Sequence, residues 1–231
     1  MLGGRRDECA VCLSRWRDWK RPAIPRGDVV RLGGNDMKIR RATKADLPTM
    51  MAIYAAARRF MAEHGNPNQW GPTNWPPESL LRSDIVDGAS YLCCCGRKVV
   101  GTFVFRIGPD IEPAYREIQG GNWLDHSPYG VVHRLASDGS AKGVGHACIE
   151  WAFARCPHLR IDTHPDNLIM QRLLEKTGFK RCGIIHVLQD GTPRFAYERS
   201  AHGALGRHGA QRAAMSNLTR RHNITPIRGL P

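Results

Sequence analysis

Two glycines lie where a predicted strand gives way to a predicted helix. Gly143 and Gly145 have no side chains, so a ligand can approach the backbone there closely. The strand pattern covers residues 129–137, and the helix pattern begins at residue 143. The first turn of a helix leaves N–H groups without partners and carries a partial positive charge. This stretch therefore predicts an anion site suited to phosphate or pyrophosphate, although a plain tight turn gives the same pattern.

A histidine on the preceding strand is the first candidate for acid–base chemistry. Strict alternation places His133 on the same face as Leu135 and Ser137, which lead into the glycine loop. A neutral imidazole can take the proton that an ammonium group must lose before it attacks a thioester. Glu117 is the competing base, and a purely structural, hydrogen-bonded role for His133 remains the alternative.

The elements that must position these groups follow from periodicity and turn signals. Apolar residues at helical spacing predict helices, alternating or continuous apolar runs predict strands, and Gly or Pro marks their ends. The expected strands are 38–42, 90–95, 99–107, 129–137, 158–164, 181–187 and 194–198, and the expected helices are 44–64, 77–86, 143–156 and a helix from 168 to just before Gly178.

The order of strand, glycine loop, helix, strand, Asn167, helix and Gly178-Phe179 resembles the GNAT superfamily of acyl-CoA-dependent N-acetyltransferases. The resemblance covers about residues 37–199. It implies an α/β (α+β) fold in which helices flank both faces of a mixed, mostly antiparallel sheet. It also implies that an acetyl group moves from acetyl-CoA to a primary amine by direct attack.

By this resemblance the glycine loop holds the pyrophosphate of acetyl-CoA, and the preceding strand offers backbone groups to the pantetheine arm. The cofactor-binding positions are then Leu135, Ala136, Ser137, Ser140, Ala141, Lys142, Gly143, Val144, Gly145, Asn167 and Leu174. The acceptor candidates are Phe60, Asn68, Trp70 and, in the long loop 108–128, Trp123. Simple packing on the core is the alternative for Trp70.

Two positions depart from the family pattern R/Q-x-x-G-x-G/A followed by Asn, Tyr and Gly-Phe. Ser140 stands where Arg or Gln is usual, and Lys142 is a nearby source of positive charge. Leu174 occupies the place of the Tyr that protonates the departing thiolate, so water, another group or unassisted departure must serve instead. Asn167 either contacts the cofactor or caps the helix that follows it.

Composition narrows the class of protein. The 231 residues are 42% hydrophobic and 24% charged, which is ordinary for a globular chain, and no apolar run is long enough to cross a bilayer. We expect a cytoplasmic protein with reduced thiols. The pair Cys9 and Cys12 has no second ligand pair at zinc-site spacing, so no metal is expected.

The net charge of +13 is spread unevenly. Residues 1–36 hold eight basic and five acidic residues, and residues 200–231 hold five arginines and no acid. We read 1–36 as an extension upstream of a natural start at Met37, 37–199 as the catalytic domain, and 200–231 as a mobile basic tail. No nucleic-acid-binding motif is present, so a nucleic-acid partner through the basic ends is the weaker alternative.

The acceptor is expected to be a small-molecule or peptide amine, without nucleic acid or membrane as partner, and a homodimer is left open. The main alternative function is a non-catalytic acyl-CoA-binding or regulatory module with the same fold. The departures at Ser140 and Leu174 favour that alternative slightly.

Overall fold

The computed structural model describes residues 28–32, 35–188 and 191–201. Its strands are β1 (Asp28–Leu32), β2 (Asn35–Arg41), β3 (Ser90–Cys95), β4 (Lys98–Gly108), β5 (Tyr129–Ser137), β6 (His158–Thr163), β7 (Lys180–His186) and β8 (Pro193–Ser200). Its helices are η1 (Lys44–Asp46), α2 (Leu47–Glu63), α3 (Glu78–Val86), η2 (Pro113–Arg116), α4 (Val144–Phe153) and α5 (Leu168–Lys176).

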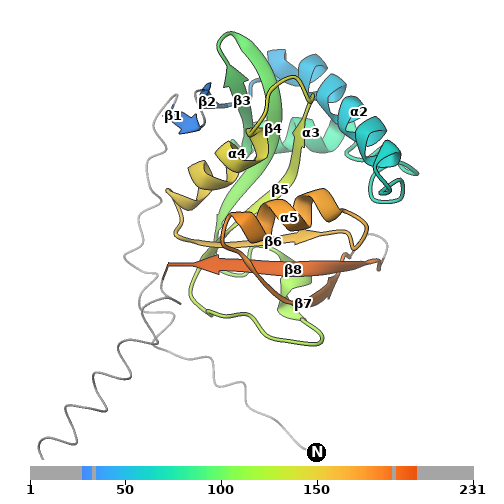
Figure 1. Cartoon of the computed structure of the whole chain (residues 1–231), viewed down its shortest axis with the longest axis vertical. Helices are drawn as coiled ribbons and strands as arrows, with labels where there is room; N and C mark the ends of the chain where they lie inside the picture. The colour runs from blue at the N-terminus through green and yellow to red at the C-terminus, as the bar shows by residue number, and fades with distance from the viewer. Residues whose placement is uncertain (1–27, 33–34, 189–190, 202–231) are drawn as a thin grey trace, which may run out of the picture.

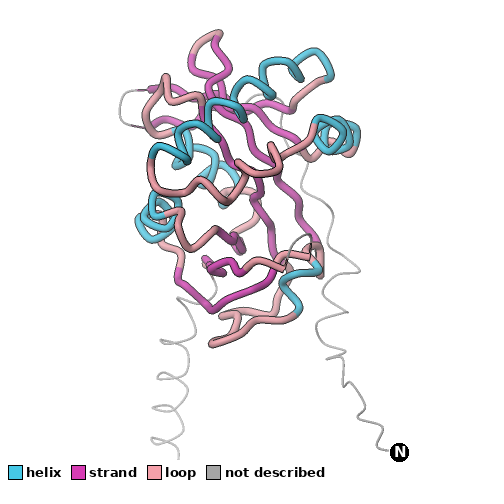
Figure 2. Tube along the Cα trace, turned by 90° about the vertical axis from the view of Figure 1, so that its right-hand side faces the viewer, coloured by secondary structure: helices cyan, strands magenta, loops and turns pink. Residues whose placement is uncertain are grey.

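The strands form one eight-stranded sheet in the order β1-β2-β3-β4-β5-β6-β8-β7 (Figure 1). Every neighbouring pair is antiparallel except β5 and β6, which run parallel in the middle of the sheet. Figure 2 shows helices on both sides of the strands. The expected class, a mixed and mostly antiparallel sheet with helices on both faces, is therefore confirmed.

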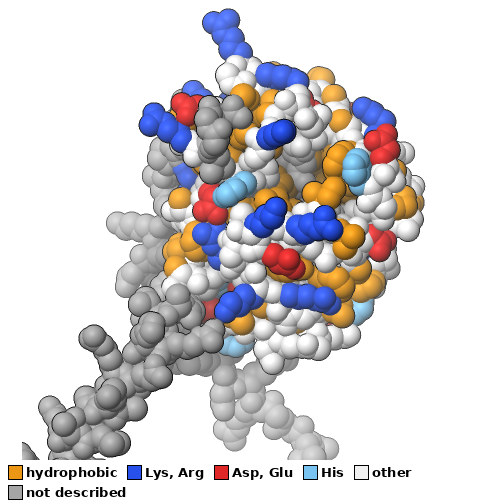
Figure 3. Space-filling model, viewed as in Figure 1, with side chains coloured by type: hydrophobic (Ala, Val, Ile, Leu, Met, Phe, Trp, Pro, Cys, Tyr) orange, Lys and Arg blue, Asp and Glu red, His pale blue; other side chains and the backbone are white. Residues whose placement is uncertain are grey.

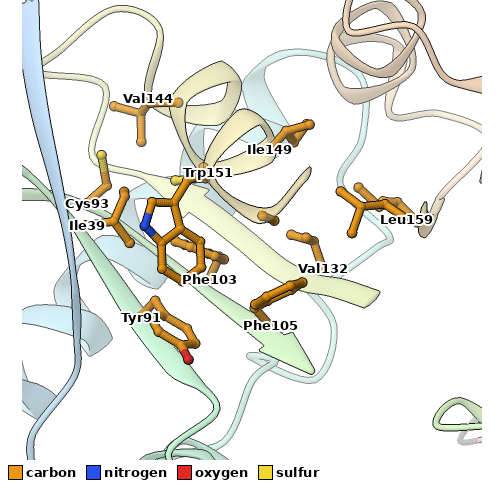
Figure 4. Packing of buried hydrophobic residues seen from close by; sticks show 14 of the residues in the cluster. Ile39, Tyr91, Cys93, Phe103, Phe105, Val132, Val144, Ile149, Trp151 and Leu159 are labelled. Carbon is orange, nitrogen blue, oxygen red and sulfur yellow. The ribbon is translucent and has the colours of Figure 1, made fainter. Parts of the chain in front are cut away.

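Helix α4 packs on one face of the sheet through a hydrophobic cluster. Trp151, which is 2% exposed, lies over Tyr91, Phe103 and Phe105, with ring centroids 4.8, 5.7 and 5.7 Å away (Figure 4). The rings come from alternate positions of β3 and β4, as the period of two in a strand requires. The α4 residues that line this contact recur at the spacing of one helical face.

Helices α2 and α3 cover the opposite face. Tyr54 is fully buried there, and Leu92, Cys94 and Ala136 supply the sheet side of the same cluster. At the N-terminal end, the Thr43 hydroxyl and backbone N–H both donate to Asp46, at 2.8 Å each. This arrangement is a capping box, and it fixes where the α2 segment turns onto the sheet.

The loop between β4 and β5 packs on the sheet beside β7. Trp123 is 8% exposed and donates its indole N–H to the Tyr115 carbonyl at 2.9 Å. The guanidinium of Arg160 lies 4.2 Å from the ring of Trp123. Gln119 adds a bridge to Ile184 of β7. Buried aromatic contacts therefore give this long loop a definite structure.

A buried carboxylate fastens that loop to the sheet. Glu198 of β8 is 0% exposed and accepts hydrogen bonds from His158 Nε2 at 2.5 Å, Arg160 Nε at 3.1 Å and the Leu124 N–H. Burial alone raises the pKa of Glu198, but the His158, Leu124 and Arg160 contacts outweigh it, so that its pKa lies below the ordinary value. The carboxylate is thus held ionised inside the protein.

The sequence-based boundaries agree with the structure for most elements and miss one strand. β1 lies within residues 1–36, where we expected no regular element, and pairs antiparallel with β2 from Asp28↔Ile39 to Leu32↔Asn35. Its five residues give too short a pattern to stand out from sequence. Residues 1–27 and 202–231, which include Cys9, Cys12 and most of the expected tail, lie outside the described residues.

We predict that Glu198→Gln lowers the free energy of unfolding by about 3–5 kcal/mol at neutral pH, because it leaves Arg160 and His158 buried without their anion. The control is Glu78→Gln on the surface of α3, which breaks the exposed pair with Arg82 and should change the stability by less than about 0.5 kcal/mol. Denaturant unfolding of both variants measures the difference, and equal effects would contradict the assignment.

The same carboxylate predicts acid sensitivity. Because folding lowers its pKa, the stabilisation is fully present above its unfolded pKa of about 4.3 and is lost as the pH falls through the lower folded value. Stability curves of wild type and Glu198→Gln should therefore converge below about pH 4, whereas a constant gap between them would be inconsistent with this origin.

Candidate functional site

A cleft of about 770 Å³ opens where the two parallel strands part. β5 and β6 are paired only at Gly130↔Leu159 and Val131↔Arg160. Beyond these pairs, residues 132–137 and 161–163 both line the cleft, one set from each strand. Backbone groups of β5 that a neighbouring strand would otherwise engage therefore face this space. The remaining walls come from α2 and the loop after it, and from the start of α5.

A bulge in β5 shapes the cleft wall. β4 pairs Thr102 with Ala136 and Val104 with His133, so two residues of β5 stand opposite one of β4. The extra residue is Arg134, whose φ of 52° is left-handed. Its carbonyl accepts from Tyr54 Oη at 3.1 Å.

The Arg134 side chain is fixed by an ion pair with α3. Its Nη2 donates to Asp84 Oδ2 at 2.5 Å, and Arg106 donates to Oδ1 of the same carboxylate at 3.1 Å. The Asp84 side chain is only 2% exposed. A buried anion on α3 therefore holds the residue whose backbone forms the bulge.

This bulge corrects one expectation from strand alternation. Val131 packs in the cluster under the β4–β5 loop, whereas Leu135 packs against the α4 cluster on the other face. Because the bulge inserts one residue, His133 stays on the face of Val131 and does not share a face with Leu135 and Ser137. His133 nevertheless lines the cleft.

His133 lies between two carboxylates. Its Nε2 is 2.9 Å from Glu112 Oε2, and its Nδ1 is 3.9 Å from Asp162 Oδ1. Asp162 Oδ1 instead accepts from Tyr115 Oη at 2.7 Å. A carboxylate only accepts hydrogen bonds, so Nε2 carries the proton and Nδ1 is left as the basic nitrogen. The side chains of Glu112, His133 and Asp162 all line the cleft.

The environment sets the ionisation of the carboxylate. Burial raises the pKa of Glu112, but the hydrogen bonds from His133 and the Ala114 N–H outweigh burial and bring it below the ordinary value. Glu112 is therefore ionised at neutral pH. The sequence alone does not single out Glu112 among the polar residues of the long loop; only its contact with His133, 21 positions later, distinguishes it.

The other base candidate is elsewhere. Glu117 is exposed and does not line the cleft. The loop that carries both glutamates folds back at η2, which turns Glu112 toward β5. Position in the long loop therefore does not indicate which of its two glutamates lines the cleft.

The glycine loop closes one end of the cleft. Gly139 and Gly143 have φ of 79° and 82°, where a side chain is strained. The Ser140 N–H and hydroxyl both bind Asp138 Oδ1, at 2.9 and 2.7 Å, and Lys98 lies 2.9 Å from the same carboxylate. Burial raises the pKa of Asp138, but these Ser140 and Lys98 contacts bring it below the ordinary value. The Ser140 hydroxyl is therefore engaged within the loop.

The predicted cofactor positions divide into two groups. The positions that line the cleft are Leu135, Ala136, Ser137, Val144, Gly145 and Asn167. The positions outside its lining are Ser140, Ala141, Lys142 and Gly143, which belong to the turn itself, and Leu174, which is 0% exposed in the core. The Leu174 side chain is therefore packed among apolar residues of the α4 face.

Asn167 has two contacts. Its Oδ1 accepts from the Met170 N–H at 3.0 Å, which confirms the helix cap. Its Nδ2 donates to Gln69 Oε1 at 2.9 Å, and that oxygen also accepts from Asn66 Nδ2 at 2.7 Å. The loop after α2 is thus tied to the start of α5 across the cleft. No local pattern predicts this link, because its partners are 98 positions apart.

The acceptor candidates are only partly together. Phe60 and Trp70 line the cleft, and Trp70 also packs edge-on against Tyr54 with centroids 5.8 Å apart. Asn68 is exposed and outside the lining. Trp123 is buried beneath the β4–β5 loop, so it belongs to the packing of that loop rather than to the cleft.

Comparison with solved structures places this arrangement in a known fold. A GNAT-family acetyltransferase from Streptococcus agalactiae is 26% identical, with a TM-score of 0.66 over 75% of this chain and 98% of the other. The chain has the GNAT fold. A GNAT-family acetyltransferase from Listeria monocytogenes is 17% identical over 74% and 99% of the two chains, with a TM-score of 0.56. The GNAT resemblance seen in the sequence is confirmed at this level.

A third structure of the GNAT fold is a ribosomal L7/L12 alpha-N-protein acetyltransferase in complex with coenzyme A. It is 12% identical, with a TM-score of 0.50 over 75% of this chain and 98% of the other. No protein-family model and no curated protein sequence matches the chain. The GNAT neighbours support acetyl transfer in general terms.

Two further observations concern ligands and surroundings. Within residues 28–32, 35–188 and 191–201, no group of three or more His, Cys, Asp or Glu side chains is arranged to hold a metal. No helix in the same ranges combines the length and apolar character needed to span a membrane.

We predict that Asp84→Asn lowers the free energy of unfolding by about 3 kcal/mol, because Arg134 and Arg106 lose a buried anion. Since Arg134 forms the bulge next to His133, the ring signals of His133 in NMR spectra should also shift. The control is Asp87→Asn, which loses a half-exposed bond to Arg106 and should leave both measurements nearly unchanged. If the His133 signals do not shift in Asp84→Asn, the ion pair between Asp84 and Arg134 does not hold the bulge in place.

Proposed function

We propose that the chain moves an acetyl group from acetyl-CoA to a primary amine by direct attack. The observation that carries the proposal is one cleft with the glycine loop at one end and the Glu112–His133 pair within it. A solved structure of the same fold holds coenzyme A, which supports an acyl-CoA as the donor. The six free cysteines among the described residues are consistent with a reducing compartment such as the cytoplasm.

The residues present fit an acyl-CoA donor. The cleft is large enough for a drug-sized group, and β5 offers backbone N–H and C=O groups where it parts from β6. The start of α4 at Gly143 supplies free N–H groups and a positive dipole end for a pyrophosphate. Lys142 adds charge beside them. Acetyl-CoA, when bound, supplies an acyl group activated as a thioester.

The chemistry at the other end is a proton transfer. Glu112 accepts the Nε2–H of His133 and so holds the ring with Nδ1 free. Nδ1 takes the proton of the acceptor ammonium, and Glu112 stabilises the imidazolium that forms. The amine nitrogen then forms a bond to the acyl carbon as the C–S bond breaks. The electron pair leaves with the sulfur, and the nitrogen loses its second proton to water to give the neutral amide. Backbone N–H groups of residues 135–137 hold the carbonyl oxygen as it becomes negative.

Leu174 cannot donate a proton to the departing sulfur, because it is an apolar side chain in the core. A thiol has a pKa of about 8–9, so a thiolate can leave without a proton near neutral pH. The buried Leu174 also favours a second candidate function, a non-catalytic acyl-CoA-binding module. The two differ in one measurement: the module binds acetyl-CoA without releasing free CoA in the presence of amines.

The first test is calorimetric titration of the full chain with acetyl-CoA. Gly143→Asp should weaken binding at least tenfold, because it places a negative charge beside the pyrophosphate. Gly96→Asp is a matched control, since Gly96 also has a positive φ of 59° and open space around it but lies in the β3–β4 turn. Equal weakening by both, or no binding by the wild type, would overturn the cofactor site.

The second test concerns the base. His133→Ala should lower the rate of acetyl transfer by about 10²–10⁴-fold while acetyl-CoA binding stays within a few fold. Glu112→Gln should lower the rate less, because the amide can still hold the ring but cannot stabilise the imidazolium. The controls are His126→Ala and Glu117→Gln, whose side chains are exposed and outside the cleft. A larger effect from Glu117→Gln than from Glu112→Gln would reverse the assignment.

A further inference from the structure

The α2 side of the cleft is a wall of rings. Phe60, His64, Trp70 and Trp75 all line it. Phe60 remains 46% exposed, although it stacks on His64 at 3.9 Å between centroids. Exposed aromatic surface in a cleft is available to a ligand, unlike a ring packed in the core.

The opposite lip of the cleft is also apolar. Leu168 and Ile169, at the start of α5, are 55% and 47% exposed and line the same cleft. Figure 3 shows hydrophobic side chains at the surface between α2 and α5. Three of the seven large hydrophobic side chains that are exposed in the described part of the chain therefore gather at this one cleft. A fully polar acceptor would gain nothing from such walls.

The inner part of the cleft is anionic. Glu112 and Asp162 are ionisable, line the cleft, and form no ion pair with Lys or Arg among the residues the structure describes. Of the two arginines in the lining, Arg134 is bound to Asp84, and Arg194 donates to Thr192 Oγ1 and the Pro193 carbonyl. The 3.9 Å separation of Asp162 from His133 Nδ1 leaves room for one ammonium N–H to reach each of them.

A chain of contacts joins the rings to the anionic part. Trp70 packs on Tyr54, and Tyr54 Oη donates to the carbonyl of Arg134, the residue next to His133. A single side chain, Tyr54, therefore connects the ring wall with the strand segment that carries His133. An aromatic ring and an ammonium joined by a short linker fit this arrangement.

We propose that the acceptor is an arylalkylamine, meaning a primary ammonium on a short carbon chain that carries an aromatic ring and no carboxylate. The ammonium lies between Asp162 and His133 Nδ1, and the ring lies against Phe60 and Trp70. A carboxylate next to the amine would face Glu112 and Asp162 and be repelled. This assignment rests on the proposed acetyl transfer and names the substrate class for that same site.

The test compares four amines with the full chain and acetyl-CoA, measuring free CoA released. 2-Phenylethylamine is the probe, butylamine lacks the ring, phenylalanine adds a carboxylate, and spermidine is a polar polycation. We expect kcat/KM for 2-phenylethylamine to exceed that for butylamine and spermidine by roughly 10–100-fold, the value of burying one aromatic ring. It should also exceed that for phenylalanine, because the carboxylate of phenylalanine is repelled. An equal or better rate with butylamine, phenylalanine or spermidine overturns the proposal.

Variants test the same point from the protein side. Phe60→Ala should raise KM for 2-phenylethylamine by about tenfold and leave butylamine unchanged, because only the ring contact is lost. The control is Val86→Ala, an apolar residue on α3 that is 71% exposed and lies outside the cleft. Asp162→Asn should raise KM for both amines. An unchanged preference in Phe60→Ala contradicts the ring site.

Calorimetry with 2-phenylethylamine alone separates this proposal from the proposed function. If the amine binds wild type and not Phe60→Ala but no CoA is released, the acceptor site stands and acetyl transfer fails. If CoA is released with other amines and 2-phenylethylamine neither binds nor reacts, acetyl transfer stands and the arylalkylamine assignment fails.

Discussion

The bulge at Arg134 is the constraint on which the site depends. It inserts one residue into β5, so side chains before and after it exchange faces. His133 is thereby turned toward Glu112 and Asp162, while Leu135 and Ser137 face the α4 side and the glycine loop. Without the bulge, His133 would share one face with Leu135 and Ser137. In the proposed function, this one extra residue lets a single strand serve the acceptor and the donor at once.

The separation of β5 and β6 is the second structural feature that shapes the site. Two parallel strands in an antiparallel sheet are joined through a crossover helix, here α4, so the glycine loop must lie at the end of β5. Their pairing stops after Val131, and the freed backbone edge becomes the floor of the cleft. The glycine loop and the open edge are thus consequences of one crossover.

Much of this fold could be predicted from sequence because its signals are local. The strand at residues 129–137, the hairpin of β3 and β4 and the helix cap at Asn167 each follow from residues a few positions apart. The bulge, the Glu112–His133 pair and the Gln69–Asn167 bond join residues distant in the chain, and no periodicity marks them. Glu117 and Trp123 show the same limit, since composition alone could not tell a surface residue or a packed ring from a cleft residue.

For the proposed acetyl transfer, Leu174 bears on where the protein must assist the reaction. The side chain at this position is fully buried in the α4 cluster and cannot donate a proton. The absence of a donor is tolerable at the sulfur, because a thiolate is a stable leaving group near neutral pH. It is not tolerable at the amine, because an ammonium has no lone pair with which to attack. The proposed reaction therefore needs a group that removes a proton from the acceptor ammonium. The cleft contains such a group: an imidazole with one carboxylate at 2.9 Å and a second at 3.9 Å, in the same cleft as the wall of aromatic rings.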